Sequence, residues 1–111
     1  MTPRLDRKVA LEERAMVPDG AGGFSGSWTP LGTLWAEFTP RTGRGAPHDE
    51  VAASLTLFDV VVRSAPVGAP SRPRPGQRLV EGPRSFSIVS VMAHKSLNNF
   101  LTLKVEEEVA R

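Results

Sequence analysis

The side chains that most often carry out chemistry are few in this chain, and their spacing assembles no catalytic site. The two histidines, His48 and His94, stand far apart, and neither has a metal-ligating neighbour at helical or hairpin spacing. Ser25, Ser27, Ser64 and Ser71 lie in glycine- or proline-rich contexts that lack the pattern around a nucleophilic serine. Cysteine is absent, which excludes disulfides and thiolate metal sites. We therefore expect no enzyme activity, no metal site and no cofactor.

Two further patterns bear on ligand binding. The glycine-rich segment 19–23 lacks the Lys-Ser/Thr pair of a phosphate-binding loop and does not join a strand to a helix, so it predicts a hairpin turn. Glu106, Glu107 and Glu108 are consecutive, and consecutive residues of a strand point to alternating sides. A solvated end or an ion pair between subunits therefore fits these acids better than a cation site.

The elements that must position these residues are predicted to be short strands. Apolar and polar residues alternate in several segments, and ten Gly and ten Pro favour many turns over long helices. Phe86 and Ile88 are expected on one face of their strand, and Val89 and Val91 on the other. We expect one all-β domain over residues 1–111, a small antiparallel β-barrel or sandwich of about six short strands. The predicted strands are 7–15, 31–38, 55–63, 78–80, 85–92 and 100 to about 107.

The strand at 55–63 is the most apolar segment. Phe58, Val60 and Val62 share one face, and Leu57 and Val61 lie on the other beside an acid. Only one face of a strand in a small barrel points to the core, so we expect the second face to be covered by another subunit.

The segment after the second predicted strand, residues 39–53, is predicted to be a long loop. A loop of about fifteen residues is uncommon in a compact domain and is usually functional or mobile. One interpretation is a plain surface loop. The other is a projection that meets a partner or a nucleic acid backbone, because Arg pairs well with phosphate and glycines let the loop bend. The residues that would make this contact are Arg41, Thr42, Gly43, Arg44, His48, Asp49 and Glu50.

Residues 65–76 contain four prolines and are predicted to be an extended, polyproline-like connection. This connection is either a stiff spacer or an arm laid on an adjacent subunit, which its prolines would pre-extend. The second interpretation is slightly favoured. Together with the outer face of 55–63 and the consecutive acids, it gives the residues expected to contact another subunit or a neighbouring ring, namely Leu57, Val61, Arg72, Arg74, Glu106, Glu107 and Glu108.

The charge distribution is only mildly uneven. The net charge is +2, with five Arg and one acid between Arg63 and Arg84, and such an excess is weak support for nucleic acid binding. The N-terminus has no continuous apolar segment, and the run Val60–Val62 is far too short to span a bilayer. We expect a soluble protein made in the cytosol, without a membrane partner.

The order of motifs resembles the head–tail joining proteins of long-tailed bacteriophages, the small head-completion or stopper subunits. The match begins with Leu5-Asp6-Arg7-Lys8-Val9, continues through Gly22, Gly23 and Trp28, and reaches Trp35-Ala36-Glu37 with Pro40 and Thr42-Gly43-Arg44. It ends with Arg63, Gly82, Phe86, Ile88, Leu101 and Leu103. Among relatives the chain looks most like the versions in gene transfer agents of α-proteobacteria, which are phage-like particles. Gly45-Ala46-Pro47 departs from the larger acidic or aromatic pair that many members carry after Arg44.

The resemblance implies a ring of subunits, usually a hexamer, between the portal–adaptor complex and the tail-terminator ring. Each subunit would be a small β-barrel whose long loop points into a central channel that carries double-stranded DNA. The protein would be cytoplasmic during assembly and then part of the particle. We expect the recombinant protein to be monomeric or weakly associated and to form the ring on its partners.

Two other functions stay open at this point. A free-standing nucleic-acid-binding small barrel is one, although few aromatics and a modest charge count against it. Another ring of the same junction, a tail terminator or an adaptor, is the second, although adaptors tend to be helical.

Overall fold

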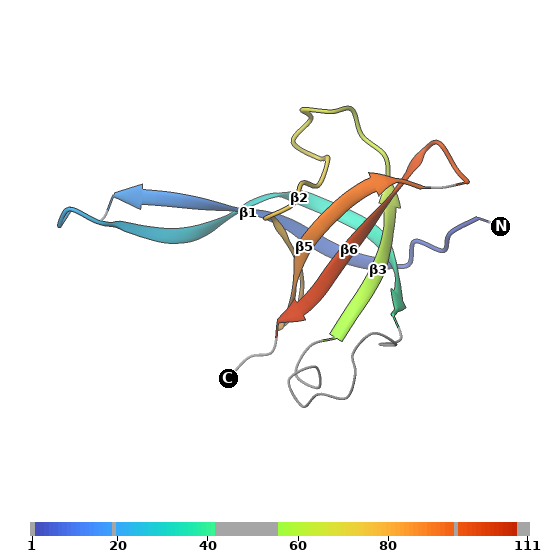
Figure 1. Cartoon of the computed structure of the whole chain (residues 1–111), viewed down its shortest axis with the longest axis horizontal. Helices are drawn as coiled ribbons and strands as arrows, with labels where there is room; N and C mark the ends of the chain where they lie inside the picture. The colour runs from blue at the N-terminus through green and yellow to red at the C-terminus, as the bar shows by residue number, and fades with distance from the viewer. Residues whose placement is uncertain (1, 19, 42–55, 95, 109–111) are drawn as a thin grey trace.

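The protein forms one closed antiparallel sheet of six strands in a computed structural model that describes residues 2–18, 20–41, 56–94 and 96–108 (Figure 1). The order around the sheet is β1-β2-β3-β6-β5-β4, and every neighbouring pair is antiparallel. The described part of the chain contains no helix. The all-β fold predicted from the sequence is therefore confirmed. The strands are β1 (Arg7–Pro18), β2 (Phe24–Pro40), β3 (Thr56–Arg63), β4 (Arg78–Glu81), β5 (Arg84–Ala93) and β6 (Phe100–Glu108).

The core fills the inside of the closed sheet. Alternate residues of each strand point inward, so the period-two pattern of the sequence becomes the core pattern of the barrel. β6 shows this clearly, because Leu101, Leu103 and Val105 are almost fully buried. The buried cluster consists of Val9, Leu11, Ala36, Phe58, Val60, Val62, Leu79, Phe86, Ile88, Leu101, Leu103 and Val105.

Three aromatic rings close one end of this core. The ring centroids of Phe38 and Phe86 lie 4.9 Å apart, and Phe58 lies 5.7 Å from each of them. Both contacts of Phe58 are edge-to-face, the arrangement that the charge distribution of aromatic rings favours. The end that holds the rings is also the end where β2 stops and β3 starts, since Pro40 pairs with Phe58.

The hairpin of β1 and β2 is much longer than the barrel. β4 pairs with β1 only over Ala10–Glu12, and β3 pairs with β2 only over Ala36–Pro40. Residues 13–18 and 24–29 therefore pair only with each other, and they project from the barrel as a two-stranded ribbon, here named the arm (Figure 1). The predicted strand 31–38 was too short, because its continuation reads as a Ser/Gly/Pro-rich loop and only pairing with β1 makes it a strand.

A β-bulge marks the place where the arm leaves the barrel. Leu11 pairs with Gly32 and Glu12 pairs with Pro30, so one extra residue of β2 is accommodated there. Gly32 has a φ of 149°, which a side chain would disfavour. A bulge of this kind bends and twists the strand that carries it, and it is also where a proline can sit within a sheet.

The proline-rich segment 65–76 is a series of turns, and the prediction of an extended connection is wrong. Backbone hydrogen bonds join Ala69 N to Pro66 O and Arg72 N to Ala69 O, each at 3.0 Å. Gly68 has a positive φ, so it lets the chain reverse between prolines whose own φ is compatible with turns.

The prediction of which β5 side chains share a face is also partly wrong. Its register against β6 shifts between Ile88 and Ser90, so one residue is left out of the alternation. Val89 consequently lies exposed on the surface, whereas Val91 packs against the same core as Phe86 and Ile88.

Candidate functional site

The predicted contact loop starts and ends at the aromatic end of the barrel. The backbone N–H of Arg41 donates a hydrogen bond to Leu57 O at 2.8 Å, which extends the β2–β3 pairing by one residue. The Arg41 side chain lies 3.5 Å from Asp59, which also pairs with Lys104 at 3.2 Å. The base of the loop is thus tied to two strands. The other predicted contact residues lie outside the described residues: Thr42, Gly43, Arg44, His48, Asp49 and Glu50.

Two ion pairs cover the aromatic end of the core. Arg7 donates through Nε and Nη2 to the carboxylate of Glu81, with an Nε distance of 3.1 Å. Arg84 donates to both oxygens of Glu107 at 2.7 and 2.9 Å. The hydrogen bonds from Arg7 and Arg84 lower the pKa of Glu81 and of Glu107, respectively, because they favour the charged carboxylates.

The guanidinium groups of these pairs also lie on the aromatic rings. The Arg7 Cζ atom is 4.0 Å from the centroid of Phe38, and the Arg84 Cζ atom is 5.1 Å from that of Phe86. The aromatic end is therefore closed by edge-to-face and tilted rings and by paired charges.

The three consecutive acids at the C-terminal end of β6 have different surroundings. Glu107 is held by Arg84, and Glu108 accepts hydrogen bonds from the hydroxyls of Ser85 and Ser87. Glu106 lies between Ser87 and Leu57 in the register of the sheet. Contact with another subunit stays a prediction for all three acids.

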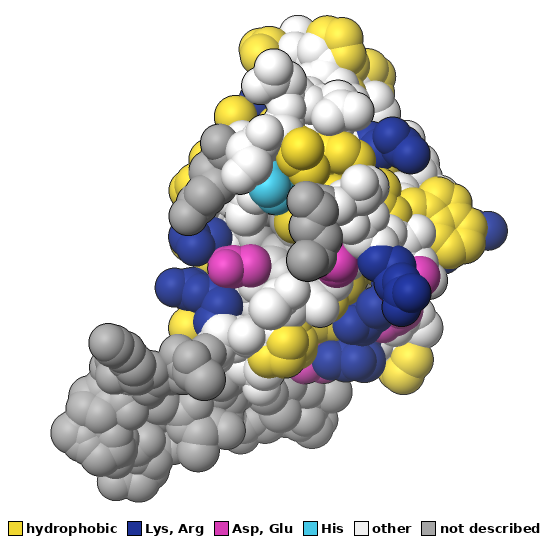
Figure 2. All heavy atoms as spheres, turned by 90° about the vertical axis from the view of Figure 1, so that its right-hand side faces the viewer, with side chains coloured by type: hydrophobic (Ala, Val, Ile, Leu, Met, Phe, Trp, Pro, Cys, Tyr) yellow, Lys and Arg dark blue, Asp and Glu magenta, His cyan; other side chains and the backbone are white. Residues whose placement is uncertain are grey.

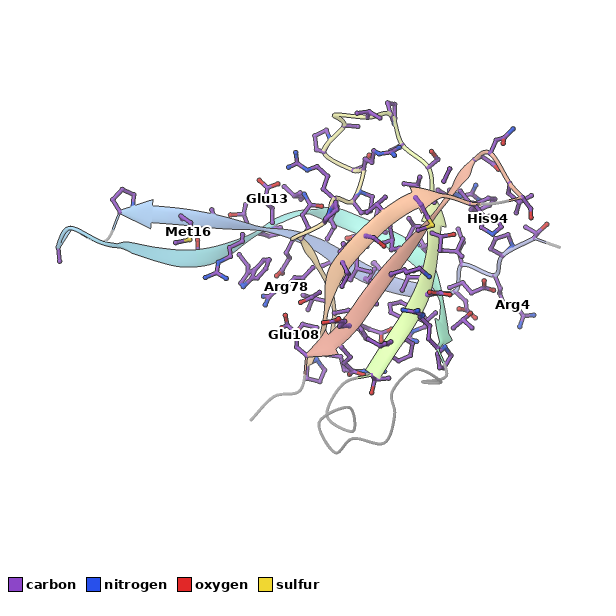
Figure 3. The ribbon with its side chains drawn as sticks, viewed as in Figure 1. Arg4, Glu13, Met16, Arg78, His94 and Glu108 are labelled. Carbon is purple, nitrogen blue, oxygen red and sulfur yellow. The ribbon has the colours of Figure 1, made fainter. Side chains whose placement is uncertain are left out.

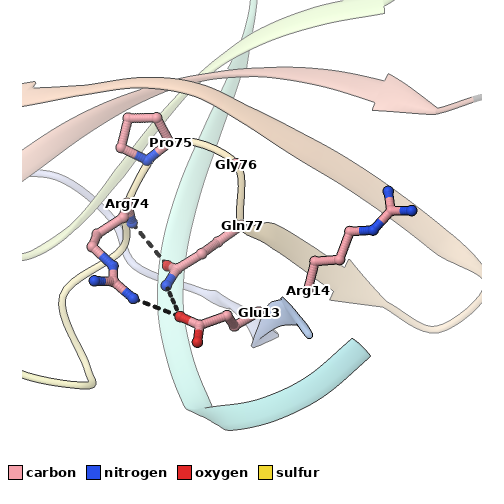
Figure 4. Close-up of a pocket in the computed structure, with 6 residues that line it drawn as sticks. All are labelled: Glu13, Arg14, Arg74, Pro75, Gly76 and Gln77. Atoms are coloured by element: carbon pink, nitrogen blue, oxygen red, sulfur yellow. Dashed lines mark hydrogen bonds and ion pairs between the residues drawn. The ribbon is translucent and has the colours of Figure 1, made fainter. Parts of the chain in front are cut away.

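The proline-rich segment is fastened to the base of the arm (Figure 4). Gln77 is only 5% exposed; its Oε1 accepts from the backbone N–H of Arg74 at 2.8 Å, and its Nε2 donates to Glu13 at 3.0 Å. The Arg74 side chain pairs with the same carboxylate of Glu13. These contacts lower the pKa of Glu13, the hydrogen bond from Gln77 first. We call Glu13, Arg74 and Gln77 the latch.

Arg72 and Arg74, which were predicted to reach another subunit, both bind within their own chain. The guanidinium of Arg72 donates to the carbonyl oxygen of Ala65 at 2.8 Å, and Arg74 belongs to the latch. Their contact with a second subunit stays a prediction.

The arm carries a surface that sequence reasoning missed. On one side of it lie Arg14, Met16 and Trp28, and the guanidinium of Arg78 stacks 4.1 Å from the Trp28 ring (Figure 3). Met16 is 56% exposed, which is unusual for a large apolar side chain. Counting outward from the predicted turn at 18–23 pairs Arg14 with Trp28, so the hairpin register was the signal that could have found this surface.

The outward faces of the barrel strands are mixed in character. Leu57 and Val61 of β3 are half-buried on the outside of the sheet, as their alternation predicted. Trp35, Val89 and Met92 are exposed. Figure 2 shows apolar side chains in separate small groups among basic and acidic ones on the face that it presents. That another subunit covers Leu57 and Val61 stays a prediction.

The described residues hold no arrangement suited to catalysis or metal binding. No group of three or more His, Cys, Asp or Glu lies close enough to hold a metal ion in this part of the chain. The same residues include no helix long and apolar enough to cross a membrane. The hollow that the latch lines measures about 430 Å³ and is open to solvent.

Comparisons with known proteins agree with this geometry. A family model described as phage head completion protein matches residues 1–108. A chain in a solved structure titled "Virion of native gene transfer agent (GTA) particle" is 42% identical, with a TM-score of 0.79 over 99% of this chain and 100% of that chain. A search of curated proteins gives no match. The family resemblance expected from the sequence is confirmed, and the chain belongs to the phage head completion proteins, a family of structural virion proteins.

Proposed function

We propose that this protein is a subunit of a ring, six copies in number, at the head–tail junction of a phage-like particle. The ring sits between the portal–adaptor complex and the tail-terminator ring, and it joins the DNA-filled head to the tail. Subunits fold in the cytoplasm and are then built into the particle. The observation that carries this proposal is the 42% identity over almost the whole length with a chain of a gene transfer agent virion.

The barrel suits this role because it is a closed, rigid unit. Closure of the sheet leaves no free strand edges around the core. The aromatic and ionic contacts stabilise the end of the barrel at which β2 stops and β3 starts, which residues 42–55 connect. In our proposal this connection faces the DNA channel, where Arg41 and Arg44 contact phosphates and the glycines allow it to bend. Joining and channel gating are thus assigned to different parts of one chain.

A free-standing nucleic-acid-binding barrel is less well supported. The arginines at positions 7, 74, 78 and 84, all outside the proposed channel contact, each pair with a carboxylate of the same chain. Paired cations release fewer counterions on binding DNA, so they contribute less to affinity than a free basic groove. A mobility-shift assay would show sub-micromolar binding with a steep salt dependence if this alternative held.

The joining role is tested by deleting the gene that encodes the chain from a particle-producing strain. We expect separate DNA-filled heads and separate tails in electron micrographs, and joined particles again when the wild-type chain is supplied. Normal joined particles in the deletion strain would refute the proposed function.

The gating role needs its own variant. Replacing residues 42–55 by a short Gly-Ser linker leaves the barrel intact, so we expect particles that still join but lose DNA when the tail is detached. DNA retention equal to the wild type would refute gating and leave joining untouched. Arg44→Ala is the milder form of the same test, and Lys8→Ala, an exposed position on the barrel wall, is its control.

A further inference from the structure

The arm lacks the support that strands normally have. Its two segments pair only with each other beyond Glu12, so both outer edges have backbone groups without a strand partner. An isolated two-stranded hairpin is marginally stable in water, and open edges are usually short or covered. An arm of this length is therefore best explained by a partner surface against which it lies.

The chemistry of the arm indicates what this surface must offer. The Arg14 guanidinium lies over Gly26, where a Cβ atom would come within 2.9 Å of it, and it has no acidic partner among the described residues. Beside it, Met16 is exposed, and the Arg78 guanidinium lies over the Trp28 ring. The arm thus presents an apolar centre with one uncompensated positive charge.

A surface of the matching chemistry exists on the same chain. Leu57 of β3 lies directly opposite Glu106 of β6 on the outside of the barrel, and Glu108 lies on the same side two residues farther along. Glu106 and Glu108 have no basic partner among the residues that the structure describes. We call Leu57, Glu106 and Glu108 the acidic wall. It offers an apolar group beside two uncompensated negative charges.

We propose that the arm of one copy binds the acidic wall of a second copy, with Arg14 pairing with Glu106 or Glu108 and Met16 and Trp28 packing near Leu57. Within one chain these surfaces are separate, because Met16 lies on the arm, which projects away from the barrel, whereas Glu108 lies on the barrel itself at the C-terminal end of β6 (Figure 3). The two surfaces differ, so the contact is heterologous, and heterologous contacts close into rings when the rotation between copies permits. This inference rests on the proposed ring and names the surfaces that build it.

A charge exchange between two variants tests the contact. Arg14→Glu should weaken self-association of the full chain at least about tenfold. The double variant that carries both Glu106→Arg and Glu108→Arg should weaken it by a similar factor, because each variant places like charges together. An equal mixture of the two variants should associate to within about threefold of the wild type, since opposite charges then meet in both directions. Sedimentation velocity measures all four samples, at protein concentrations high enough for the weakly associating wild type to form oligomers. A mixture no better than its components, or single variants equal to the wild type, would overturn the proposal.

Disulfide cross-linking provides a second readout, because the chain has no natural cysteine. Met16→Cys and Glu108→Cys, made in chains of different tag length, should give a mixed disulfide on oxidation, both in solution and in assembled particles. Each variant alone should give little, and Lys8→Cys with Glu108→Cys is the control pair. Efficient disulfide formation between two Met16→Cys chains would overturn the proposed contact between copies. So would particles in which the introduced cysteines cross-link only to other particle proteins. Either result leaves the deletion test of head–tail joining unaffected.

Discussion

Gln77 is the buried polar residue on which the latch depends, and replacing it gives a sharp test of how the arm is mounted. Gln77→Ala removes two hydrogen bonds at once, one from the Arg74 backbone N–H and one to the Glu13 carboxylate. The first contributes about 1 kcal/mol. The second joins a charged group, but the Glu13 side chain is 40% exposed, so solvent weakens this hydrogen bond.

The expected loss in the free energy of unfolding is therefore at least about 1 kcal/mol, a measurable part of the roughly 5–15 kcal/mol of a small domain. Urea unfolding followed by tryptophan fluorescence measures this loss. Gln77→Met is the matched control, because Met fills similar space without hydrogen bonds and should lose nearly as much as Ala. A Met variant as stable as the wild type would refute the reasoning, since packing rather than hydrogen bonding would then hold the segment.

Three further predictions concern the aromatic end and the arm. The pKa values of the Glu81 and Glu107 carboxyl groups are lowered in the folded state, so their ion pairs with Arg7 and Arg84 stabilise the fold above the unfolded pKa of about 4.5. This stabilisation is lost as the pH falls below that value. Glu107→Gln should reduce the pH dependence of stability in urea titrations from pH 7 to 3. Phe86→Ala should cost about 3–5 kcal/mol in the free energy of unfolding, since the ring is fully buried against two others, and a loss below 1 kcal/mol would contradict the packing. Gly26→Ala should leave the free energy of unfolding within about 0.5 kcal/mol of the wild type, because the Arg14 guanidinium can shift away from the new methyl group. The same shift should weaken self-association, and unchanged association would argue against a fixed position of Arg14.

The sequence was most informative where one local pattern has one structural outcome. Alternation in 100–107 predicted the inward face of β6, and the turn at 18–23 predicted the reversal between β1 and β2. The family resemblance was also readable from motifs alone. Prediction was weaker for segments whose composition suits both loop and strand, such as 24–30, because pairing with a distant partner decides between them.

The candidate site was less accessible to sequence reasoning than the fold. Arg72, Arg74 and Glu107 are basic and acidic residues of a kind that fits a subunit contact, yet each binds within its own chain. Met16 carries no motif, and its exposure on one side of a projecting ribbon depends on where β3 and β4 stop pairing.

The sequence by itself determined that the chain is all-β, and its motifs resemble those of the head completion proteins. The all-β prediction follows from residue types and short-range periodicity, which the backbone geometry of a strand converts directly into faces. Only the tertiary structure decided that the hairpin outgrows the barrel and that the proline-rich segment is latched to it. Those features depend on register and on contacts such as Glu13 with Gln77, whose residues are far apart in the chain and meet only when the sheet closes.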